Sequence, residues 1–410
     1  MRATETTSRP LIEYLDSIPD PRSSREKKHN LAEMLICLIA GYVSGHTSLR
    51  RCISWCKRNI SVLKKGMTLK NGIASPATMC RMLCSIDEEL FLYAFMEWIA
   101  EILDPKGRHL AIDGKAIIAA ASKVKGTTTP MLLNVIDTAT SLVIAQMPIE
   151  SKENEIVKIP VLLKLLNIQE CTITTDAIGT QTSIMEQIVS QGGHFVQVVK
   201  KNQPNSYGEL CFQFSDKKVK YDEHISKEKN RDRYEYRSCK ISTDLEYLTK
   251  VKKEWPFVKS VGCISHTRIL LIRDEYGNDI TPDLNTFQHS GTFRQPIPSS
   301  GDNRNDDNQV IGIISDLELT AEEAEKCRRD HWSVENRLHH VLDDTFREDR
   351  SPAKKSKNNF ALIRKIAYNL VRIAAIQQSL IQPITELLDL FSDDKHLLEK
   401  YLFKGIPCIP

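Results

Sequence analysis

Three acidic residues stand at positions where their surroundings are mostly apolar. Asp113 follows the run HLAI and precedes Gly-Lys, and Asp176 follows TITT and precedes Ala-Ile-Gly. Glu335 lies within RRDHWSVENRLHHVLDD, residues 328–344. Carboxylates are rarely buried without partners. Each Asp alone is typical of a turn or a helix cap, but two of them, each at the end of an apolar strand, favour a shared function.

The chemistry that suits such acids is metal-assisted phosphoryl transfer. Carboxylates that face one another repel, and Mg²⁺ relieves this repulsion because it takes oxygen ligands in octahedral geometry. Two such ions, about 3.5–4 Å apart, activate an attacking oxygen and stabilise a leaving oxygen. We therefore predict that Asp113, Asp176 and Glu335 are catalytic ligands of Mg²⁺, with Mn²⁺ as an expected substitute.

A polar stripe accompanies Glu335. If residues 328–344 form one helix, His331, Glu335, His339 and Asp343 recur at steps of four and share a face. We predict that His331, His339 and Asp343 support the site by positioning water, a leaving group or a phosphate. One alternative is a solvated helix with acid–imidazole pairs. A zinc hydrolase is disfavoured because the His-Glu-x-x-His spacing is absent.

The composition is that of a soluble globular protein. The chain has 410 residues, enough for two or three domains, and its net charge of +3 does not by itself imply nucleic acid. We expect no signal peptide and no membrane span. Eleven scattered cysteines indicate free thiols in a reducing cytoplasm. The Cys-x3-Cys pairs at 52–56 and 80–84 leave a zinc site open, but helical thiols on an apolar face are favoured.

The elements that would position these residues change in character along the chain. Residues 1–105 are predicted to be helical, with a helix ending at Gly45, a basic helix over 48–65 and a helix capped by Ser75. The turn at 104–107 marks a domain boundary. The helix after the third strand is expected to be regular from about Pro160. The strands expected beyond the boundary cover 108–120, 131–137, 141–149, 171–177 and 194–202.

The order β-β-β-α-β-α-β predicts an α/β fold, a ribonuclease-H-like mixed sheet flanked by helices. The first and fourth strands, which carry Asp113 and Asp176, are neighbours in that topology. A helix restarts at Thr320, where Glu323 completes a capping box. The expected divisions are an all-helical N-terminal domain, a catalytic domain in two segments, a β-rich insertion with a polar loop from about 288, and a helical C-terminal tail: 1–105, 106–203 with 309–380, 204–308, and 381–410.

Five ordered motifs carry a resemblance: DGKAIIAA, KENEIVKIPVLLKLL, TTDAIGTQ, VVKKNQP and RDHWSVENRLHHVLDDTFREDRS. They resemble the transposases of ISAs-type insertion sequences, or H-repeat-associated proteins, which are DDE transposases with a β-strand insertion. The resemblance covers nearly the whole chain. Ile118 stands where the family commonly has Arg, and His340 where it often has Trp. The resemblance implies a metal triad of Asp113, Asp176 and Glu335, with Gln181 near the site and Lys115, Lys200, Asn202 and Gln203 at the DNA backbone or around the site.

Basic residues indicate where DNA would bind. Residues 48–70 hold seven Lys and Arg and no acid, and further basic segments lie at 22–29 and 347–359. A helix–turn–helix-like pair, 48–63 and 76–86, would place Thr78, Met79 and Arg81 in a major groove. A charge run is also typical of a solvated face. The residues expected to bind DNA in this region are Arg50, Arg51, Lys57, Arg58 and Arg81.

The function expected from these features is DNA transposition. The protein would cleave the ends of an insertion sequence and join the freed 3′-hydroxyl to target DNA. Its partners would be double-stranded DNA, as terminal inverted repeats and as target, and a second copy of the chain in at least the DNA complex. The expected location is the bacterial cytoplasm, at the nucleoid when bound to DNA. The alternatives are a catalytically idle or domesticated DNA-binding relative, and a ribonuclease-H-like nuclease that cuts without joining.

Overall fold

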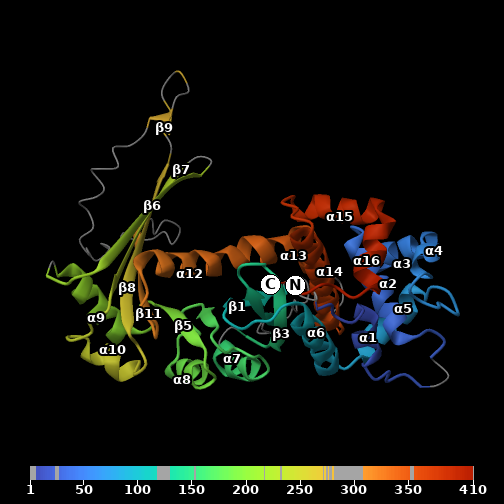
Figure 1. The fold of residues 1–410 in the computed structure, drawn as a ribbon, viewed down its shortest axis with the longest axis horizontal. Helices are drawn as coiled ribbons and strands as arrows, with labels where there is room; N and C mark the ends of the chain where they lie inside the picture. The colour runs from blue at the N-terminus through green and yellow to red at the C-terminus, as the bar shows by residue number, and fades with distance from the viewer. Residues whose placement is uncertain are drawn as a thin grey trace, which may run out of the picture. The chain divides into compact units, whose positions relative to one another are not determined.

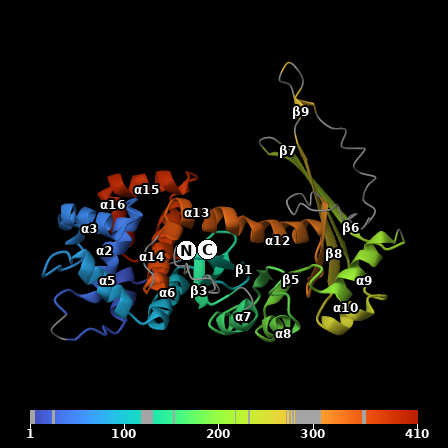
Figure 2. The same cartoon turned by 180° about the vertical axis from the view of Figure 1, so that it is seen from behind.

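The structure is a computed structural model of the chain. It divides into two compact units, one formed by Met1–Asn167 with Trp332–Pro410 and the other by Ile168–His331. Figures 1 and 2 show the elements of both units from opposite sides. The residues that the structure describes are 6–23, 27–117, 130–151, 154–216, 218–230, 233–270, 272–273, 276, 279–280, 308–350 and 355–409.

Helices form the N-terminal part of the first unit, as predicted. The Asn30 side chain accepts a hydrogen bond from the Glu33 amide and so caps α2, which ends before Gly45, a residue with a φ of +79°. Ser75 caps α5 as expected, and Pro76 follows in its first turn. The basic helix predicted over 48–65 is instead two helices, interrupted at Asn59. The N-terminal helices are α1 Leu11–Asp16, α2 Leu31–Val43, α3 Leu49–Arg58, α4 Ile60–Leu63, α5 Pro76–Ser85 and α6 Glu88–Ile102.

Three antiparallel strands form the sheet of the first unit, in the order β3-β2-β1. Their bounds are β1 His109–Ala116, β2 Met131–Asp137 and β3 Val143–Ile149. They agree with the predicted strands, although residues 118–129, with Ile118 and the expected turn, lie outside the described residues. The helices α6, α7 and α14 pack against β3.

The helix α14 Lys357–Gln377 is the central helix of the first unit. It is buried along nearly its whole length and packs against α2, α5, α6 and α15. Two further helices follow it, α15 Ile384–Asp393 and α16 Lys395–Phe403. The predicted long core helix and the helical tail are both present.

The helix α7 Glu155–Lys164 starts earlier than predicted. We expected regular helix only from about Pro160, but Pro160 lies inside it. Proline cannot donate its backbone hydrogen bond to the residue four positions earlier. The packing of Ile159, Leu162 and Leu163, all buried, outweighs this loss.

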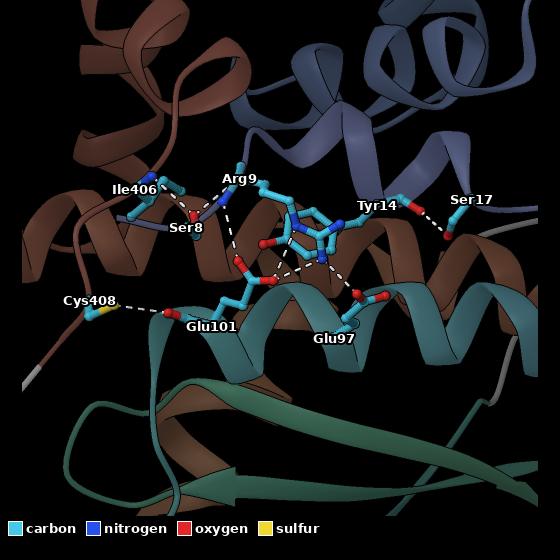
Figure 3. A network of polar contacts seen from close by, with 8 residues as sticks. All are labelled: Ser8, Arg9, Tyr14, Ser17, Glu97, Glu101, Ile406 and Cys408. Carbon is cyan, nitrogen blue, oxygen red and sulfur yellow. Dashed lines mark hydrogen bonds and ion pairs between the residues drawn. The ribbon is translucent and has the colours of Figure 1, made fainter. Parts of the chain in front are cut away.

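The two ends of the described chain are tied to α6 (Figure 3). The Arg9 guanidinium lies 2.6 Å from Glu97 and 2.8 Å from Glu101. The Ile406 amide donates to the Ser8 hydroxyl, at 3.1 Å. These contacts fix the chain ends of the first unit beside the helix that leads into β1.

The second unit is a mixed sheet extended by the insertion. Its strand order is β4-β5-β11-β8-β7-β6, in which β4 and β5 are parallel and the other pairs are antiparallel. The strands are β4 Thr172–Thr175, β5 His194–Val199, β6 Asp222–Asn230, β7 Arg233–Ser242, β8 Ser260–Leu270 and β11 Asn308–Ser315, with a separate pair, β9 Ile272–Arg273 and β10 Asp279–Ile280.

Three helices accompany this sheet before α12. They are α8 Thr182–Ser190, α9 Pro204–Ser215 and α10 Thr249–Glu254. The β-rich character of the insertion is confirmed, whereas α9 and α10 were not anticipated. The polar loop predicted from about 288 to 307 lies outside the described residues.

The helix α12 Ala321–Val334 begins on the second unit, and its residues from Trp332 belong to the first. Ala321 and Ala324 pack against the sheet residues Val196, Ile264 and Ile313. The predicted capping box is confirmed, because the Glu323 carboxylate accepts hydrogen bonds from the Thr320 amide and hydroxyl and the Thr320 hydroxyl accepts one from the Glu323 amide. No helix in the described part of the chain is both long and apolar enough to cross a membrane.

Candidate active site

Asp113 lies inside β1 and not at its end, where it was predicted, because the strand continues to Ala116. It lies opposite Asn134 of β2, and its own Oδ1 accepts a hydrogen bond from the Gly114 amide, at 2.9 Å. A side chain at position 114 would collide with the buried Glu155 carboxylate. A larger residue beside Asp113 would therefore have to displace the end of the Glu155 side chain.

Glu335 begins a widened helical turn. After α12 ends at Val334, residues Glu335–His339 form a π-helical turn, and α13 His340–Asp344 follows. Such turns are rare and occur frequently at functional sites. Within this turn the His339 Nδ1 lies 2.9 Å from Glu335 Oε2 and 3.6 Å from Asp113 Oδ2.

These three side chains form a candidate divalent-ion site. Asp113, Glu335 and His339 each offer a ligand atom, and the three atoms lie within 4.8 Å of one another. Mg²⁺ prefers oxygen, so the two carboxylates fit as ligands and the imidazole fits as the group that orients Glu335.

Two buried polar atoms beside these carboxylates support that interpretation. The His339 side chain is only 5% exposed, and its Nε2 has no hydrogen-bond partner. The Oδ1 of Asn134, opposite Asp113, is also buried without a partner. The Glu335 side chain, in contrast, is 73% exposed. A site with buried unpaired polar atoms on one side and an exposed carboxylate on the other suits a ligand that enters from solvent.

The predicted polar stripe divides among different partners. Of its four residues, Glu335 and His339 approach Asp113. The His331 Nδ1 lies 3.0 Å from the Thr174 hydroxyl in the second unit. Asp343 instead accepts a hydrogen bond from Lys115. The π-helical turn changes the helical phase between Glu335 and Asp343, whereas His331 lies before it on α12.

Asp176 follows β4 in the second unit. Its Oδ1 accepts from the Ala177 amide, at 2.7 Å, and lies 3.6 Å from the Lys200 ammonium. The Asn202 amide group donates to the Ala177 carbonyl, at 3.1 Å. Gln203 donates to the Thr180 carbonyl, at 2.8 Å. In this structure Asn202 and Gln203 therefore hold the turn that follows Asp176.

Gln181, which was expected near the site, also stabilises the turn that follows Asp176. Its amide group donates to the Ile178 carbonyl, at 3.1 Å. The motifs TTDAIGTQ and VVKKNQP thus meet in the second unit.

Lys115 is buried among carboxylates of the first unit. Its side chain is 5% exposed, and its ammonium lies 2.6 Å from Asp343, 3.2 Å from Glu348 and 3.7 Å from Asp349. In this structure the ammonium is enclosed by protein rather than presented to DNA. Lys115 connects the strand of Asp113 to the segment that follows α13.

Glu348 is the buried centre of this ion cluster. Its burial alone would raise its pKa, but the charges of Lys365, Lys115 and Arg364 lower that pKa below its ordinary value. Burial lowers the pKa of Lys365 to about 8, against the attraction of Glu348. The Lys365 ammonium donates to Gln146 on β3, at 2.7 Å. The cluster therefore joins β1, β3 and α14 around the chain segment behind Glu335.

The basic N-terminal residues expected to bind DNA are exposed. These are Arg50, Arg51, Lys57, Arg58 and Arg81. Met79, however, is completely buried. The prediction that Met79 enters a major groove is therefore wrong, because its position on α5 faces the core.

The Cys-x3-Cys pairs do not form a metal cluster in the described residues. Cys52 and Cys56 are buried in α3, and burial raises the pKa of Cys52 to about 12. Zinc binds the thiolate, so this environment disfavours the zinc alternative at that pair.

Sequence reasoning missed the residues that surround these acids. Glu155, Glu348 and Lys365 carry charges yet are buried. A signal existed for Glu155, which lies in the first turn of α7 within a motif of the resemblance. The same signal existed for Glu348, which lies within the motif RDHWSVENRLHHVLDDTFREDRS. Lys365 had none, because a charged residue in a long helix is ordinarily solvated.

Two family models match this chain. The family model for the transposase DDE domain matches residues 104–370, and the model for the DDE_Tnp_1-associated domain matches residues 12–99. The first match alone covers more than half of the chain. This chain belongs to the DDE transposase family.

Relatives of the transposase include several proteins of Escherichia coli K12. The H repeat-associated putative transposase YhhI is 28% identical over 88% of this chain and 90% of its own length. The putative protein YbfL has the same identity and coverage, and the H repeat-associated putative transposase YbfD is 31% identical over 55% of this chain and 91% of its own. A piggyBac transposase synaptic complex with hairpin DNA has a TM-score of 0.42 at 9% identity, over 96% of this chain and 78% of that one. That likeness is too low to add to the family assignment.

The contact between His339 and Glu335 gives a first test in the transposase. We expect His339→Ala to weaken Mn²⁺ binding about 10–100-fold, because groups that orient metal ligands have effects of that size. The measurement is calorimetric titration with Mn²⁺. The control is His340→Ala, which removes the adjacent imidazole, 63% exposed and paired with Asp344. Equal affinities for both variants would contradict an orienting role for His339.

The lowered pKa of Glu348 predicts a pH-dependent stability of the transposase. We expect Glu348→Gln to reduce the free energy of unfolding by about 3–5 kcal/mol at pH 7, since it leaves Lys115 and Lys365 short of a buried counter-ion. Because the folded-state pKa lies below the ordinary value of 4.5, the wild-type advantage should be complete above that pH. It should disappear as pH falls through the lower, folded-state pKa.

Urea unfolding of both proteins from pH 3 to 7 measures this difference. Glu386→Gln, an exposed change on α15, is the control and should shift stability by less than about 0.5 kcal/mol at every pH. A difference between wild type and Glu348→Gln that stays constant with pH would refute the assigned role of Glu348.

Proposed function

We propose that this transposase cleaves DNA at the ends of its insertion sequence and joins each freed 3′-hydroxyl to target DNA. The observation that carries the proposal is the grouping of Asp113, Glu335 and His339 within 4.8 Å, in a chain of the DDE transposase family. In the cleavage step, water attacks the scissile phosphorus and the bond to the 3′-oxygen breaks. In the joining step, that 3′-hydroxyl attacks a phosphodiester of the target, and a target 3′-oxygen leaves.

Each acid has a proposed part in this reaction. Asp113 and Glu335 would hold Mg²⁺ from the first unit, and Asp176 would supply the third carboxylate from the second. Bound divalent ions would increase the nucleophilicity of the attacking oxygen and stabilise the leaving oxygen. His339 would keep Glu335 in position through the 2.9 Å contact. Asn202 and Gln203 would keep Asp176 in position by holding the backbone of the following turn.

The DNA would be bound by basic residues outside the acids. Arg50, Arg51, Lys57, Arg58 and Arg81 are exposed on the first unit, and phosphate contacts from such residues supply affinity without reading sequence. We propose Lys200, beside Asp176, for the strand near the acids. Lys115 would not contact DNA directly, because its ammonium is enclosed by carboxylates; its effect on DNA binding would be indirect, through the positions of those carboxylates. Two copies of the chain would pair two element ends, in the cytoplasm.

Neutral substitutions of the proposed ligands test this function. We expect Asp113→Asn and Glu335→Gln each to lower strand cleavage at least about a hundredfold, a loss typical of removing transition-state charge stabilisation. Binding of the uncleaved duplex should remain. The measurement is cleavage of a duplex that carries the inverted repeats flanking the gene. Asp344→Asn, an exposed carboxylate on α13 that pairs with His340, is the control and should cleave normally.

A joining assay then separates a transposase from a nuclease. Pre-cut ends are incubated with a supercoiled plasmid and Mg²⁺, and joined product is measured. Joined product that is lost with Glu335→Gln supports the proposal. Cleavage without any joined product would assign a cutting activity alone, and full cleavage by Asp113→Asn would show that the site is wrong.

A further inference from the structure

A second concave site of the first unit is lined by arginines. It is a cavity of about 620 Å³ between α3, α5, α14 and the segment after α13. Five of the lining residues are arginines, and no lining residue is acidic. We call it the arginine cavity, defined by Arg50, Arg51, Arg347, Arg350 and Arg364 with the uncharged Tyr42, Thr47, Ser48, Leu49, Pro76, Cys80 and Phe360.

Arg364 forms the buried wall of this cavity. The residue is 3% exposed, and its Nε has no hydrogen-bond partner. Its guanidinium carbon lies 5.4 Å from the ring centroid of Tyr42 and 5.7 Å from that of Phe360. Among the described residues, no carboxylate lies within ion-pair distance of it. The buried Glu348 is near enough for the Arg364 charge to lower its pKa, but Arg364 Nε remains without a hydrogen bond. A buried donor without an acceptor is costly, and an anion in the cavity would supply one.

The other four arginines line the same cavity. Arg50 and Arg51 lie in the first turn of α3, and Arg347 and Arg350 lie on either side of the buried Glu348. All four are exposed, and none forms an ion pair with a carboxylate in the described part of the chain. Phe346 and Glu348 are buried and fix this segment in the protein. The four exposed guanidiniums are therefore available to a ligand.

Phosphate is the chemistry that such a set recognises. Arginine presents a rigid fork of donors that binds phosphate oxygens in pairs, and it stacks on aromatic rings as Arg364 does here. Five guanidiniums without a neutralising acid in the lining exceed what one carboxylate ligand requires. The cavity is suited to a ligand with phosphate groups.

The position of the cavity favours the phosphates of a DNA backbone. Asp113 and Lys115 lie two residues apart on β1, and the Lys115 ammonium pairs with Glu348, at 3.2 Å. Glu348 lies between two of the cavity arginines, and Arg364 helps to lower its pKa. The ion cluster thus joins the acidic site to the arginine cavity within one unit. A strand anchored at the cavity would be fixed relative to Asp113 and Glu335.

We propose that the arginine cavity binds backbone phosphates of DNA and anchors the strand that is cut at the acidic site. The anchoring role rests on the proposed function, whereas phosphate binding by the cavity does not. Contacts of this kind carry no sequence information, so any duplex engages them.

The test uses the full chain with Arg50→Gln and Arg347→Gln combined, two exposed changes on different segments of the cavity. Its binding to a fluorescein-labelled duplex of arbitrary sequence is measured by anisotropy in EDTA, across a range of salt concentrations. We expect affinity to fall roughly tenfold and the slope of log affinity against log salt to decrease by about one to two, since each lost phosphate contact removes about 0.9. Circular dichroism confirms that the variant is folded.

A matched control removes the same charge elsewhere on the first unit. Lys164→Gln with Lys404→Gln changes two exposed lysines that do not line the cavity, and its affinity and salt slope should equal those of the wild type. An equal loss in the control would show a general charge effect and overturn the proposal. An unchanged affinity and slope in the arginine variant would do the same.

Inorganic pyrophosphate distinguishes a small ligand from DNA. It is titrated as a competitor at constant ionic strength. Two results together support a cavity that binds backbone phosphates: pyrophosphate displaces the duplex from the wild-type protein, and the arginine variant binds the duplex more weakly. Tight pyrophosphate binding with normal DNA binding in the arginine variant would assign the cavity to a free phosphorylated molecule and overturn the proposal.

The EDTA buffer keeps this outcome separate from catalysis. If the variant loses DNA binding while the wild type never cleaves in Mg²⁺, the cavity assignment stands and the proposed function fails. If the wild type cleaves DNA in Mg²⁺ while the arginine variant binds DNA normally, the proposed function stands and the cavity assignment fails.

Discussion

The grouping of Asp113, Glu335 and His339 is the constraint on which the candidate site depends. One carboxylate is carried by a strand and the other by a helix, and both lie with His339 in a group whose ligand atoms are within 4.8 Å. A divalent cation bound there would offset the repulsion between the two carboxylates. The π-helical turn carries both Glu335 and His339, whose side chains are grouped with Asp113.

The surroundings of that pair are built from further charges. Lys115, on the same strand as Asp113, is enclosed by three carboxylates, and Glu348 joins it to Lys365 and Arg364 on α14. A buried ion network of this kind contributes little net stability but is expensive to break. It therefore favours one geometry over others. Arg364 belongs both to this network and to the lining of the arginine cavity, so the proposed anchoring of DNA would be linked to the placement of the acids.

Much of this architecture could be predicted from local pattern. Acids that interrupt apolar runs located Asp113 on β1 and Asp176 after β4, although Asp113 lies within its strand and not at its end. Cap residues such as Ser75 located helix starts. The π-helical turn could not be predicted from the sequence. Polar residues four positions apart are typical of an ordinary α-helix, and nothing in this spacing indicates a π-helical turn. The burial of Lys115 depends on acids more than two hundred residues away in sequence, beyond any local pattern. The helix α9 was missed although Pro204 marks its first turn.

The most direct test of this account is where a divalent ion binds. Crystals of the protein grown with Mn²⁺ would be measured at the manganese absorption edge, and the anomalous difference map calculated. The account predicts a peak bonded to a carboxylate oxygen of both Asp113 and Glu335, at about 2.0–2.3 Å, values typical of small divalent cations with oxygen ligands. A well-ordered site at saturating Mn²⁺ with no anomalous density between those two residues would contradict it.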